Sequence, residues 1–402
     1  MEVNMRQTYR ILPVYTGDVS GVCSALYELG GMTVMHDPSG CNSTYNTHDE
    51  TRWYDRDSLI FLSGLCEPDA IMGSDEKFIG DVVRAAQAYR PAFIALCNSP
   101  IPYLTGTDFA GISNVIEHRT GIPTLYVPTN GMHDYVTGAG LAFEKLAVKL
   151  FEGKSGAAPK ERTVNVLGMT PLDFASEKSA DSIKTLLERE GWEVGSVWAM
   201  GSSLEEIMDY GCACVNLVVS SAGLPAAKVL RDKFGTPWIC GMPVGGEAGR
   251  LASFLERAEA EGFCGCLYDQ KERESGREVQ LPDRIIIGEP VSSCSIAEFF
   301  ESRGISARVI AATEGSGELI RRGDLICRGE EEVEDALSKL CGEGTKVIAD
   351  PMYGLVCPPG AQLIPVVHLA FSGRVYRSGF ADPFDRSFAG TLTGSANASA
   401  WR

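Results

Sequence analysis

The chain has 402 residues, more than a single hydrophobic core usually organises, so two or three domains are expected. Its 36 basic and 53 acidic residues give a formal net charge of −17, which argues against nucleic acid or an anionic membrane as a partner. The first residues are polar and no apolar run approaches the roughly 18 residues of a membrane span, so a cytoplasmic protein is expected. Its thirteen cysteines should then be free thiols.

The first informative stretch is the apolar run 26–35, which leads directly into the polar sequence HDPSGC at 36–41. A second apolar run, 91–97, is typical of a buried parallel strand and ends at Cys97. Open α/β sheets bind their ligands at the carboxyl ends of strands. Cys41 and Cys97 are therefore expected at a ligand-binding edge.

A weak internal repeat predicts the architecture. An apolar strand, an intervening stretch and a second strand introduced by proline occur three times, with the prolines at positions 123, 237 and 365. Helical patterns at 182–190 and 295–303 start at serine and end before glycine, so strands and helices alternate. We expect an α/β protein of three doubly wound, parallel-sheet domains. The expected domains are 1–155, 161–275 and 281–402, with polar or charged linkers between them.

Potential metal ligands are concentrated in the first expected domain. Soft thiolates select iron–sulfur clusters or zinc, but these cysteines lack the close pairs of structural zinc sites. Cys41 stands out because Gly40 and a polar run flank it, whereas core packing is an equal alternative for the others. No GxxxxGK[ST] sequence occurs, and Gly138 and Gly140 follow no apolar strand as a dinucleotide fingerprint should. This chain should not hydrolyse ATP itself.

Five segments of the sequence carry a resemblance to a known family. They are HDPSGC at 36–41, CEPDAIMGSDEK at 66–77, IALCNSPIPYLTGTD at 94–108, IPVVHLAF at 364–371 and DPFDRSFAG at 382–390. Together they resemble the nitrogenase component 1 family, which includes molybdenum–iron protein subunits, cofactor scaffolds and dark protochlorophyllide reductase subunits, and residues 36–41 resemble that family's His-Gly-Pro-x-Gly-Cys segment. The resemblance implies three Rossmann-like domains and an iron–sulfur cluster, [4Fe-4S] or larger, at a subunit interface. It also implies a homodimer, or a heterodimer or heterotetramer with a paralogous subunit.

The resemblance carries cluster ligands over to particular residues. Cys41 and Cys97 match the family's second and third cluster cysteines. The first would be expected around residues 18–20, where this chain has no cysteine. Cys23, about one turn inside a helix that begins near Asp18, is the available thiol, and Asp18 and Cys66 are the alternatives. For Cys23, a buried helix-face thiol without a ligand role is an equal alternative.

The resemblance also argues against an iron–molybdenum cofactor in this chain. The family's catalytic subunit anchors that cofactor through a cysteine after a second-domain strand, where this chain has Ser220 and Ser221. The family's second anchor, a histidine, aligns near Ala370, two positions after His368. Cys240, Cys294 and Cys357 either line a different pocket between domains or pack in cores.

Three functions stay open. In the first, the chain is the iron–sulfur subunit of a two-component reductase and passes electrons to a small-molecule substrate or second cofactor. A separate iron-protein-like ATPase would hydrolyse the ATP, and His36, His133 or His368 would donate protons. In the second, the chain is a scaffold for metallocluster assembly. In the third, it binds a small ligand without metal, and its cysteines are packing residues.

Overall fold

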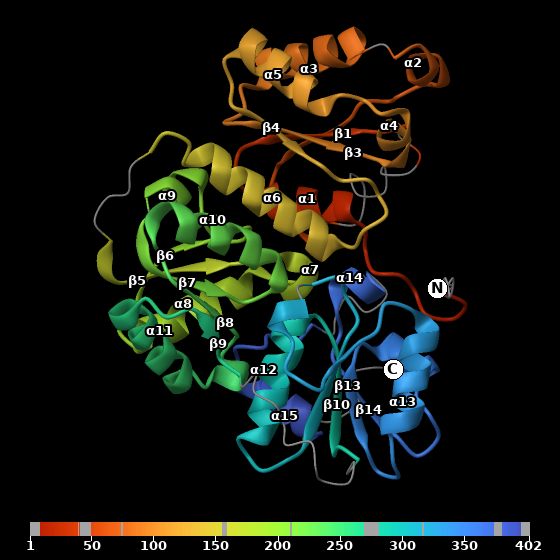
Figure 1. Ribbon diagram of the computed structural model, residues 1–402, viewed down its shortest axis with the longest axis vertical. Coiled ribbons are helices and arrows are strands. Elements are labelled where there is room, and N and C mark those ends of the chain that lie inside the picture. Colours follow the sequence, from red (N-terminus) through yellow and green to blue (C-terminus); the bar gives the residue numbers. More distant parts are fainter. Residues whose placement is uncertain are drawn as a thin grey trace.

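The computed structural model describes residues 9–38, 40, 50–73, 75–154, 159–209, 211–268, 281–315, 317–373 and 380–394. These residues form three separate sheets, which we name the N-terminal, middle and C-terminal sheets. Figure 1 shows the N-terminal sheet at one end of the molecule and the C-terminal sheet at the other. Every pairing between the named strands is parallel, as the alternation of strands and helices predicted. Within the described ranges, no helix is both long and apolar enough to cross a membrane.

The N-terminal sheet has the strand order β2-β1-β3-β4. Its strands are β1 (Met32–His36), β2 (Leu59–Leu62), β3 (Ile94–Asn98) and β4 (Thr124–Val127). Helices α3 (Asp75–Tyr89) and α5 (Phe109–Thr120) cover one face, and α1 (Asp18–Leu26) and α6 (Tyr135–Leu150) cover the other. Because side chains alternate along a strand, Leu96 packs under α3 and α5 whereas Cys97 faces α1 and α6.

The middle and C-terminal sheets have five strands each, in the orders β6-β5-β7-β8-β9 and β12-β11-β10-β13-β14. The middle strands are β5 (Lys160–Leu167), β6 (Glu193–Val197), β7 (Ala213–Val218), β8 (Trp238–Cys240) and β9 (Gly265–Cys266). The C-terminal strands are β10 (Arg284–Gly288), β11 (Ala307–Ala311), β12 (Leu325–Ile326), β13 (Lys346–Ala349) and β14 (Gln362–Pro365). In both sheets the first strand is an interior one, with strands added on both sides of it, which is a doubly wound arrangement.

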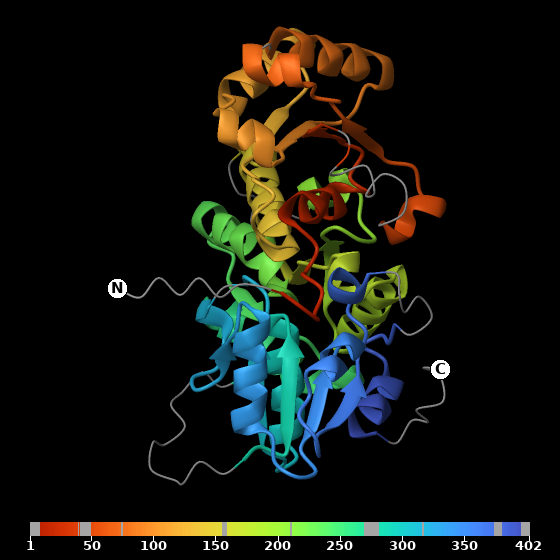
Figure 2. The same ribbon diagram turned by 90° about the vertical axis from the view of Figure 1, so that its right-hand side faces the viewer.

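Longer helices accompany these two sheets. They are α8 (Glu177–Arg189), α10 (Leu224–Phe234), α11 (Gly249–Glu261), α12 (Pro290–Glu301) and α13 (Glu330–Leu340). Shorter helices are α2 (Glu67–Met72), α4 (Pro100–Thr105), α7 (Pro171–Phe174), α9 (Leu204–Asp209), α14 (Leu369–Ser372) and α15 (Arg386–Thr393). Figure 2, turned from the view of Figure 1, shows that the short α1 and the longer α6 lie between the N-terminal sheet and the rest of the molecule.

Glycines bring α6 close to its neighbours. A Cβ atom at Gly138 would clash with the backbone of Asp18 on α1, and one at Gly21 would clash with the backbone of Tyr135 on α6. On the opposite side of α6, Gly140 faces Pro225 at the start of α10, and a Cβ there would lie 3.3 Å from Cγ of Pro225. Gly138 and Gly140 therefore serve helix packing, in agreement with the expectation that they do not form a dinucleotide fingerprint.

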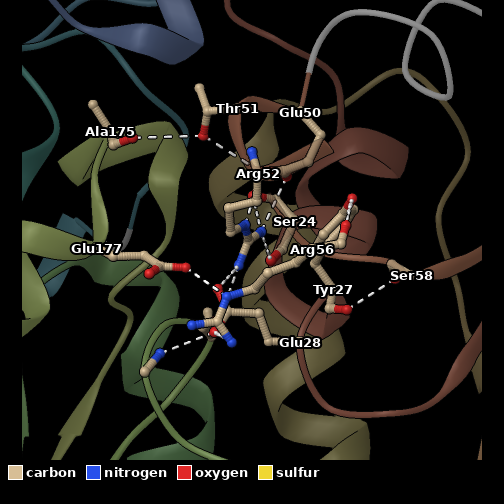
Figure 3. A network of polar contacts seen from close by, with 12 residues as sticks. Ser24, Tyr27, Glu28, Glu50, Thr51, Arg52, Arg56, Ser58, Ala175 and Glu177 are labelled. Atoms are coloured by element: carbon tan, nitrogen blue, oxygen red, sulfur yellow. Dashed lines mark hydrogen bonds and ion pairs between the residues drawn. The ribbon is translucent and has the colours of Figure 1, made fainter. Parts of the chain in front are cut away.

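A buried arginine ties the first part of the chain to the middle sheet (Figure 3). Arg52 donates to Glu50 Oε1 and to Glu28 Oε1, each at 2.8 Å, and all three side chains are at most 4% exposed. Its Nη1 also donates to the carbonyl oxygen of Ala199, which follows β6, at 2.9 Å. The segment 50–54 is thus held both to the region of α1, through Glu28, and to the segment after β6, through Ala199. It begins nine residues after Cys41.

Candidate functional site

The structure brings Cys23 and Cys97 together. Cys23 lies on α1 and Cys97 near the end of β3, on the sheet face that α1 covers, and their thiols are neighbours in the same core. Both are completely buried, and Cys97 Sγ lies 3.7 Å from the carbonyl oxygen of Val34. Burial, followed by the neighbouring Cys97 thiol, raises the pKa of Cys23 well above its ordinary value. Without a metal ion this thiol is therefore protonated.

Cys41 lies outside the described residues, but the segment that leads to it is placed. His36 is the last residue of β1 and pairs in register with Asn98, which directly follows Cys97 on β3. Neighbouring strands β1 and β3 connect to opposite sides of the N-terminal sheet, so their carboxyl ends border a topological switch point. The chain therefore leaves β1 beside the Cys97 strand, five residues before Cys41.

Cys66 lies at the same edge and is exposed. It precedes α2, and the amide of its neighbour Leu65 donates to the carbonyl oxygen of Asp37 at 2.9 Å. The Cys66 thiol donates to Asp69 Oδ2 at 2.9 Å, and Lys77 Nζ lies 2.6 Å from that oxygen. The hydrogen bond from Cys66, with the one from Lys77, lowers the pKa of Asp69. An accessible thiol is thus available where β1 and β2 end.

Asp18, the alternative oxygen ligand, is already engaged. Its carboxylate accepts hydrogen bonds from the amides of Val19 at 2.7 Å, Asn130 at 2.9 Å and Gly131 at 3.0 Å. Burial nevertheless raises the pKa of Asp18. These contacts hold the loop before α6 against the start of α1. Within the described part of the chain, no group of three His, Cys, Asp or Glu residues is placed to hold a metal ion.

Two of the three candidate histidines, His36 and His133, make contacts in different parts of the structure. His36 is buried at the end of β1, its Nδ1 lies 2.7 Å from Ser63 Oγ, and its ring packs on Phe78 at a centroid distance of 4.1 Å. Burial lowers the pKa of His36 to about 4, so the ring is neutral at neutral pH. His133 is half-exposed and its Nδ1 lies 2.9 Å from Glu314 Oε2, in a contact between the start of α6 and the loop after β11.

His368 belongs to a network that the sequence did not predict. Its Nε2 lies 3.2 Å from Asp173 Oδ1, and that oxygen also accepts a 2.5 Å hydrogen bond from the hydroxyl of Tyr135. The other oxygen of Asp173 accepts from Ser220 Oγ at 2.7 Å. Burial, with the charge of Asp173, raises the pKa of Tyr135 well above its ordinary range, so the phenol stays a donor. Elements α6, α7, β7 and β14 meet at this carboxylate.

Asp173 and His368 line a cavity of about 70 Å³ with Glu289 and Asp350. Glu289 directly follows β10, and its carboxylate accepts from the amides of Ser221 at 2.8 Å and Ser292 at 2.9 Å. Asp350 directly follows β13, and its Oδ2 accepts from the amide of His368 at 2.8 Å. Burial raises the pKa of Glu289 and of Asp350. Both acids precede a proline that starts a helical turn, a strand-acid-proline pattern that was visible in the sequence.

Cys240, Cys294 and Cys357, for which a pocket and core packing were the alternatives, do not line this cavity. Among the described residues that line the cavity there is no cysteine. Cys240 is fully buried on β8 beside Cys266 of β9, and Cys294 is fully buried on α12. Cys357 follows β13, is partly buried and packs against the core of the C-terminal sheet. The core-packing interpretation therefore fits all three residues.

Known proteins share sequence with this chain over about half of its length. Residues 21–259, more than half of the chain, match the family model described as nitrogenase component 1 type oxidoreductase. The chain is 24% identical over 222 residues to the nitrogenase iron-molybdenum cofactor biosynthesis protein NifE of Klebsiella pneumoniae, covering 52% of this chain and 48% of that protein. It is 27% identical over 222 residues to a light-independent protochlorophyllide reductase polypeptide of Synechococcus elongatus, covering 53% and 43%. The chain thus matches less than half of the length of these curated relatives.

The similarity of fold extends over the whole chain. A solved structure described as nitrogenase Cp1 at pH 6.5 superposes with a TM-score of 0.68 at 17% identity, covering 98% of this chain and 94% of the other. The same protein at pH 5 gives a TM-score of 0.65. These structures confirm the predicted fold class, and the family model confirms the resemblance seen in residues 36–108. The chain belongs to the nitrogenase component 1 type oxidoreductase family.

Proposed function

We propose that this chain is the iron–sulfur subunit of a two-component, ATP-dependent reductase. The observation that carries the proposal is the contact between the Cys23 and Cys97 thiols, at the edge of the sheet where the Cys41 segment begins. The membership of the chain in an oxidoreductase family supports it. A separate iron-protein-like ATPase would deliver the electrons, in keeping with the lack of a GxxxxGK[ST] sequence in this chain.

The donor set fits thiolate ligation. Cys23 and Cys97 would supply two neighbouring sulfur ligands, Cys41 a third, and Cys66 or a partner's residue would complete the shell. An iron–sulfur cluster, [4Fe-4S] or larger, would supply one-electron chemistry at low potential when bound there. The protein residues would hold the cluster, exclude water and set its potential through hydrogen bonds to sulfur.

An apolar surface beside Cys66 supports a site at a subunit interface. Helices α2 and α4 lie next to each other at this edge and expose large apolar side chains. These are Ile71 (74% exposed), Met72 (80%), Ile101 (39%), Tyr103 (51%) and Leu104 (73%). Large apolar side chains exposed together on neighbouring helices favour a contact with another protein. We propose that it packs against a subunit of the same fold, either a second copy or a paralogue.

Directly packed elements connect the Cys23 thiol with the cavity that Asp173 and His368 line. Helix α1, which carries Cys23, packs directly on α6, and the first residue of α6 is Tyr135. The Tyr135 hydroxyl bonds to Asp173, which lines the cavity with His368. We propose that electrons leave the cluster along this direction toward a substrate or second cofactor, with His368, which lines the cavity, as the proton donor.

The cavity does not fit an iron–molybdenum cofactor. Its volume of about 70 Å³ gives room for roughly five water molecules. None of the described residues that line it is a cysteine, whereas His368 is held by Asp173 through Nε2. We therefore propose no such cofactor and no reduction of dinitrogen by this chain alone.

The second candidate function is a scaffold on which a metallocluster is assembled and then released. The similarity to a cofactor biosynthesis protein of Klebsiella pneumoniae favours it. A scaffold would use the same thiols with one weak or exchangeable ligand, and the exposed Cys66 meets that description.

Anaerobic purification with iron and acid-labile sulfide analysis tests both candidates. We expect iron and sulfide in the native protein, and their loss in Cys41→Ala and Cys97→Ala but not in Cys212→Ala, a matched variant of a half-buried thiol that lies just before β7. Native protein without iron would overturn both candidates in favour of a metal-free ligand-binding protein. Turnover that requires an iron protein and ATP would support the reductase, and transfer of the cluster to an acceptor protein would support the scaffold.

A further inference from the structure

Cys240 and Cys266 lie side by side on the last two strands of the middle sheet. Strands β8 and β9 run parallel, and Cys240 pairs in register with Cys266. The amide of Leu267 donates to the carbonyl oxygen of Cys240 at 2.7 Å, which holds the two strands together at this point. Because paired residues of neighbouring strands point to the same face of a sheet, the two thiols lie on one face.

The spacing of the two residues is that of a disulfide. Neighbouring strands lie roughly 4.8 Å apart, and disulfides join residues whose Cα atoms are about 4.4–6.8 Å apart. Linking Cys240 to Cys266 therefore needs little movement of the backbone. Gly241 keeps the two strand ends close, because a Cβ atom at that position would lie 2.5 Å from Cβ of Leu267. Both thiols are free in the structure.

The two thiols differ in reactivity. As a hydrogen-bond donor, the neighbouring Cys240 thiol lowers the pKa of Cys266, although burial acts in the opposite direction. Burial raises the pKa of Cys240 well above its ordinary value. Since the thiolate is the reactive form, Cys266 is the thiol that an oxidant attacks first, and Cys240 is placed to react with the product.

A small oxidant has a route to this pair. Strand β9 is an edge strand, and Cys266 is 9% exposed whereas Cys240 is completely buried. Directly after the two strands, Met242 and Leu267 line a cavity of about 260 Å³ to which α11 and α12 also contribute. A cavity of this volume has room for many molecules of the size of water. Hydrogen peroxide is only slightly larger, so it fits this route.

We propose that Cys240 and Cys266 form a reversible disulfide when the protein meets a peroxide. The Cys266 sulfur attacks a peroxide oxygen, the O–O bond breaks, and a sulfenic acid and one water molecule result. The Cys240 sulfur then attacks the Cys266 sulfur, so that the S–S bond forms, the S–O bond breaks and a second water molecule leaves. Two thiols thereby lose two electrons and two protons, and one peroxide is reduced to two water molecules.

A dithiol reductant reverses the change by thiol–disulfide exchange. This inference goes beyond the proposed function. It concerns two thiols of the middle sheet that are not among the proposed cluster ligands, and it holds whether or not the chain carries a cluster.

Cys264 provides an internal comparison. It directly precedes β9 and is more accessible than Cys266, since it is only partly buried. Its sulfur accepts a hydrogen bond from the amide of Trp238 at 3.4 Å, so it lies beside Trp238 rather than beside Cys240. Accessibility alone would favour Cys264 as the thiol that is linked, whereas the register of the strands favours Cys266.

Peptide mapping by mass spectrometry without reduction tests the proposal on the full chain treated with hydrogen peroxide. We expect a peptide pair linked through Cys240 and Cys266, and its loss after treatment with dithiothreitol. Cys264→Ala should keep the link and Cys266→Ala should abolish it. In Cys240→Ala, Cys266 should instead accumulate as a sulfenic acid that dimedone traps.

Two results would overturn the proposal. One is the absence of the link at a peroxide concentration that oxidises the exposed Cys66 completely, and the other is a link from Cys240 to Cys264. Iron analysis of the same preparations keeps this test separate from that of the proposed function. Protein without iron that still forms the link would overturn the proposed function and support the disulfide.

Discussion

The Cys23 thiol on α1 lies against the Cys97 thiol at the end of β3, and neither is accessible to solvent. In protein prepared without metal, Cys23 should therefore resist alkylation by iodoacetamide at mildly alkaline pH, because burial raises the pKa of its thiol and the thiolate is the reactive form. The exposed Cys66 should react under the same conditions. Mass spectrometry of peptides from the alkylated protein measures both, and equal labelling of Cys23 and Cys66 would contradict the burial of the thiol pair.

The buried Arg52 gives a prediction about stability. Arg52→Met removes the buried cation that Glu28 and Glu50 share and leaves Glu28 with the more exposed Arg56 at 3.6 Å, so we expect the free energy of unfolding to fall by about 3–5 kcal/mol. Arg84→Met is the matched control, because Arg84 is 75% exposed and its pair with Asp81 is a surface contact worth at most about 1 kcal/mol. Urea denaturation followed by circular dichroism compares the two. A loss below that of the control would show that the network contributes little.

Tyr135 should stabilise the carboxylate beside the cavity. Tyr135→Phe removes a hydroxyl that donates to Asp173 Oδ1 and leaves that oxygen with only His368, so we expect a loss of about 1–3 kcal/mol. Tyr103→Phe, at a half-exposed ring, should change the stability little. Urea denaturation followed by circular dichroism measures the free energy of unfolding of both variants. Equal effects of the two changes would mean that the contact between Tyr135 and Asp173 adds no stability.

His36 should make the protein less stable in acid. Its folded-state pKa of about 4 lies below the ordinary value of 6.5, so protonation favours the unfolded chain, and stability present above pH 6.5 is lost as the pH falls toward 4. Between pH 7 and pH 5 this residue alone should cost about 2 kcal/mol. Unfolding at both pH values should show a smaller loss in His36→Gln than in the native protein.

The exposed His118 provides the comparison for this pH dependence. His118→Gln should keep the full loss of stability of the native protein between the two pH values. If His36→Gln and His118→Gln behave alike, the pKa of His36 is not lowered by burial.

The positions of many strands and helices were predictable from local sequence patterns. The apolar run that ends at Cys97 contains β3, and the helical patterns at 182–190 and 295–303 fall in the second halves of α8 and α12. The strands expected after Pro123 and Pro237 are β4 and β8, whereas β14 ends at Pro365 and is not introduced by it. These features depend on hydrophobic periodicity and on helix stop signals, which act over a few residues. The expected domain limits at 155–161 and 275–281 stay a prediction.

The cavity was harder to predict because it depends on contacts between distant segments. Asp173, Glu289 and His368 belong to three different segments, and the packing of α7 against α14 brings Asp173 to His368. Glu289 and Asp350 each stand between a strand and a proline, but a helix cap explains that pattern equally well. The ligand roles of Cys23, Cys41 and Cys97 likewise stay predictions.

The close packing of α1 on α6 at Gly138 and Gly21 limits how this protein can be altered. Any side chain at Gly138 on α6 would push α1 outward, and Cys23 would move with α1. Helix α6 also begins with Tyr135, which donates a hydrogen bond to Asp173. The thiol pair and the cavity thus share one rigid support. An engineer who reshapes one of them by moving α6 will also disturb the other, so redesign of the cavity is best confined to the loops after β10, β13 and β14.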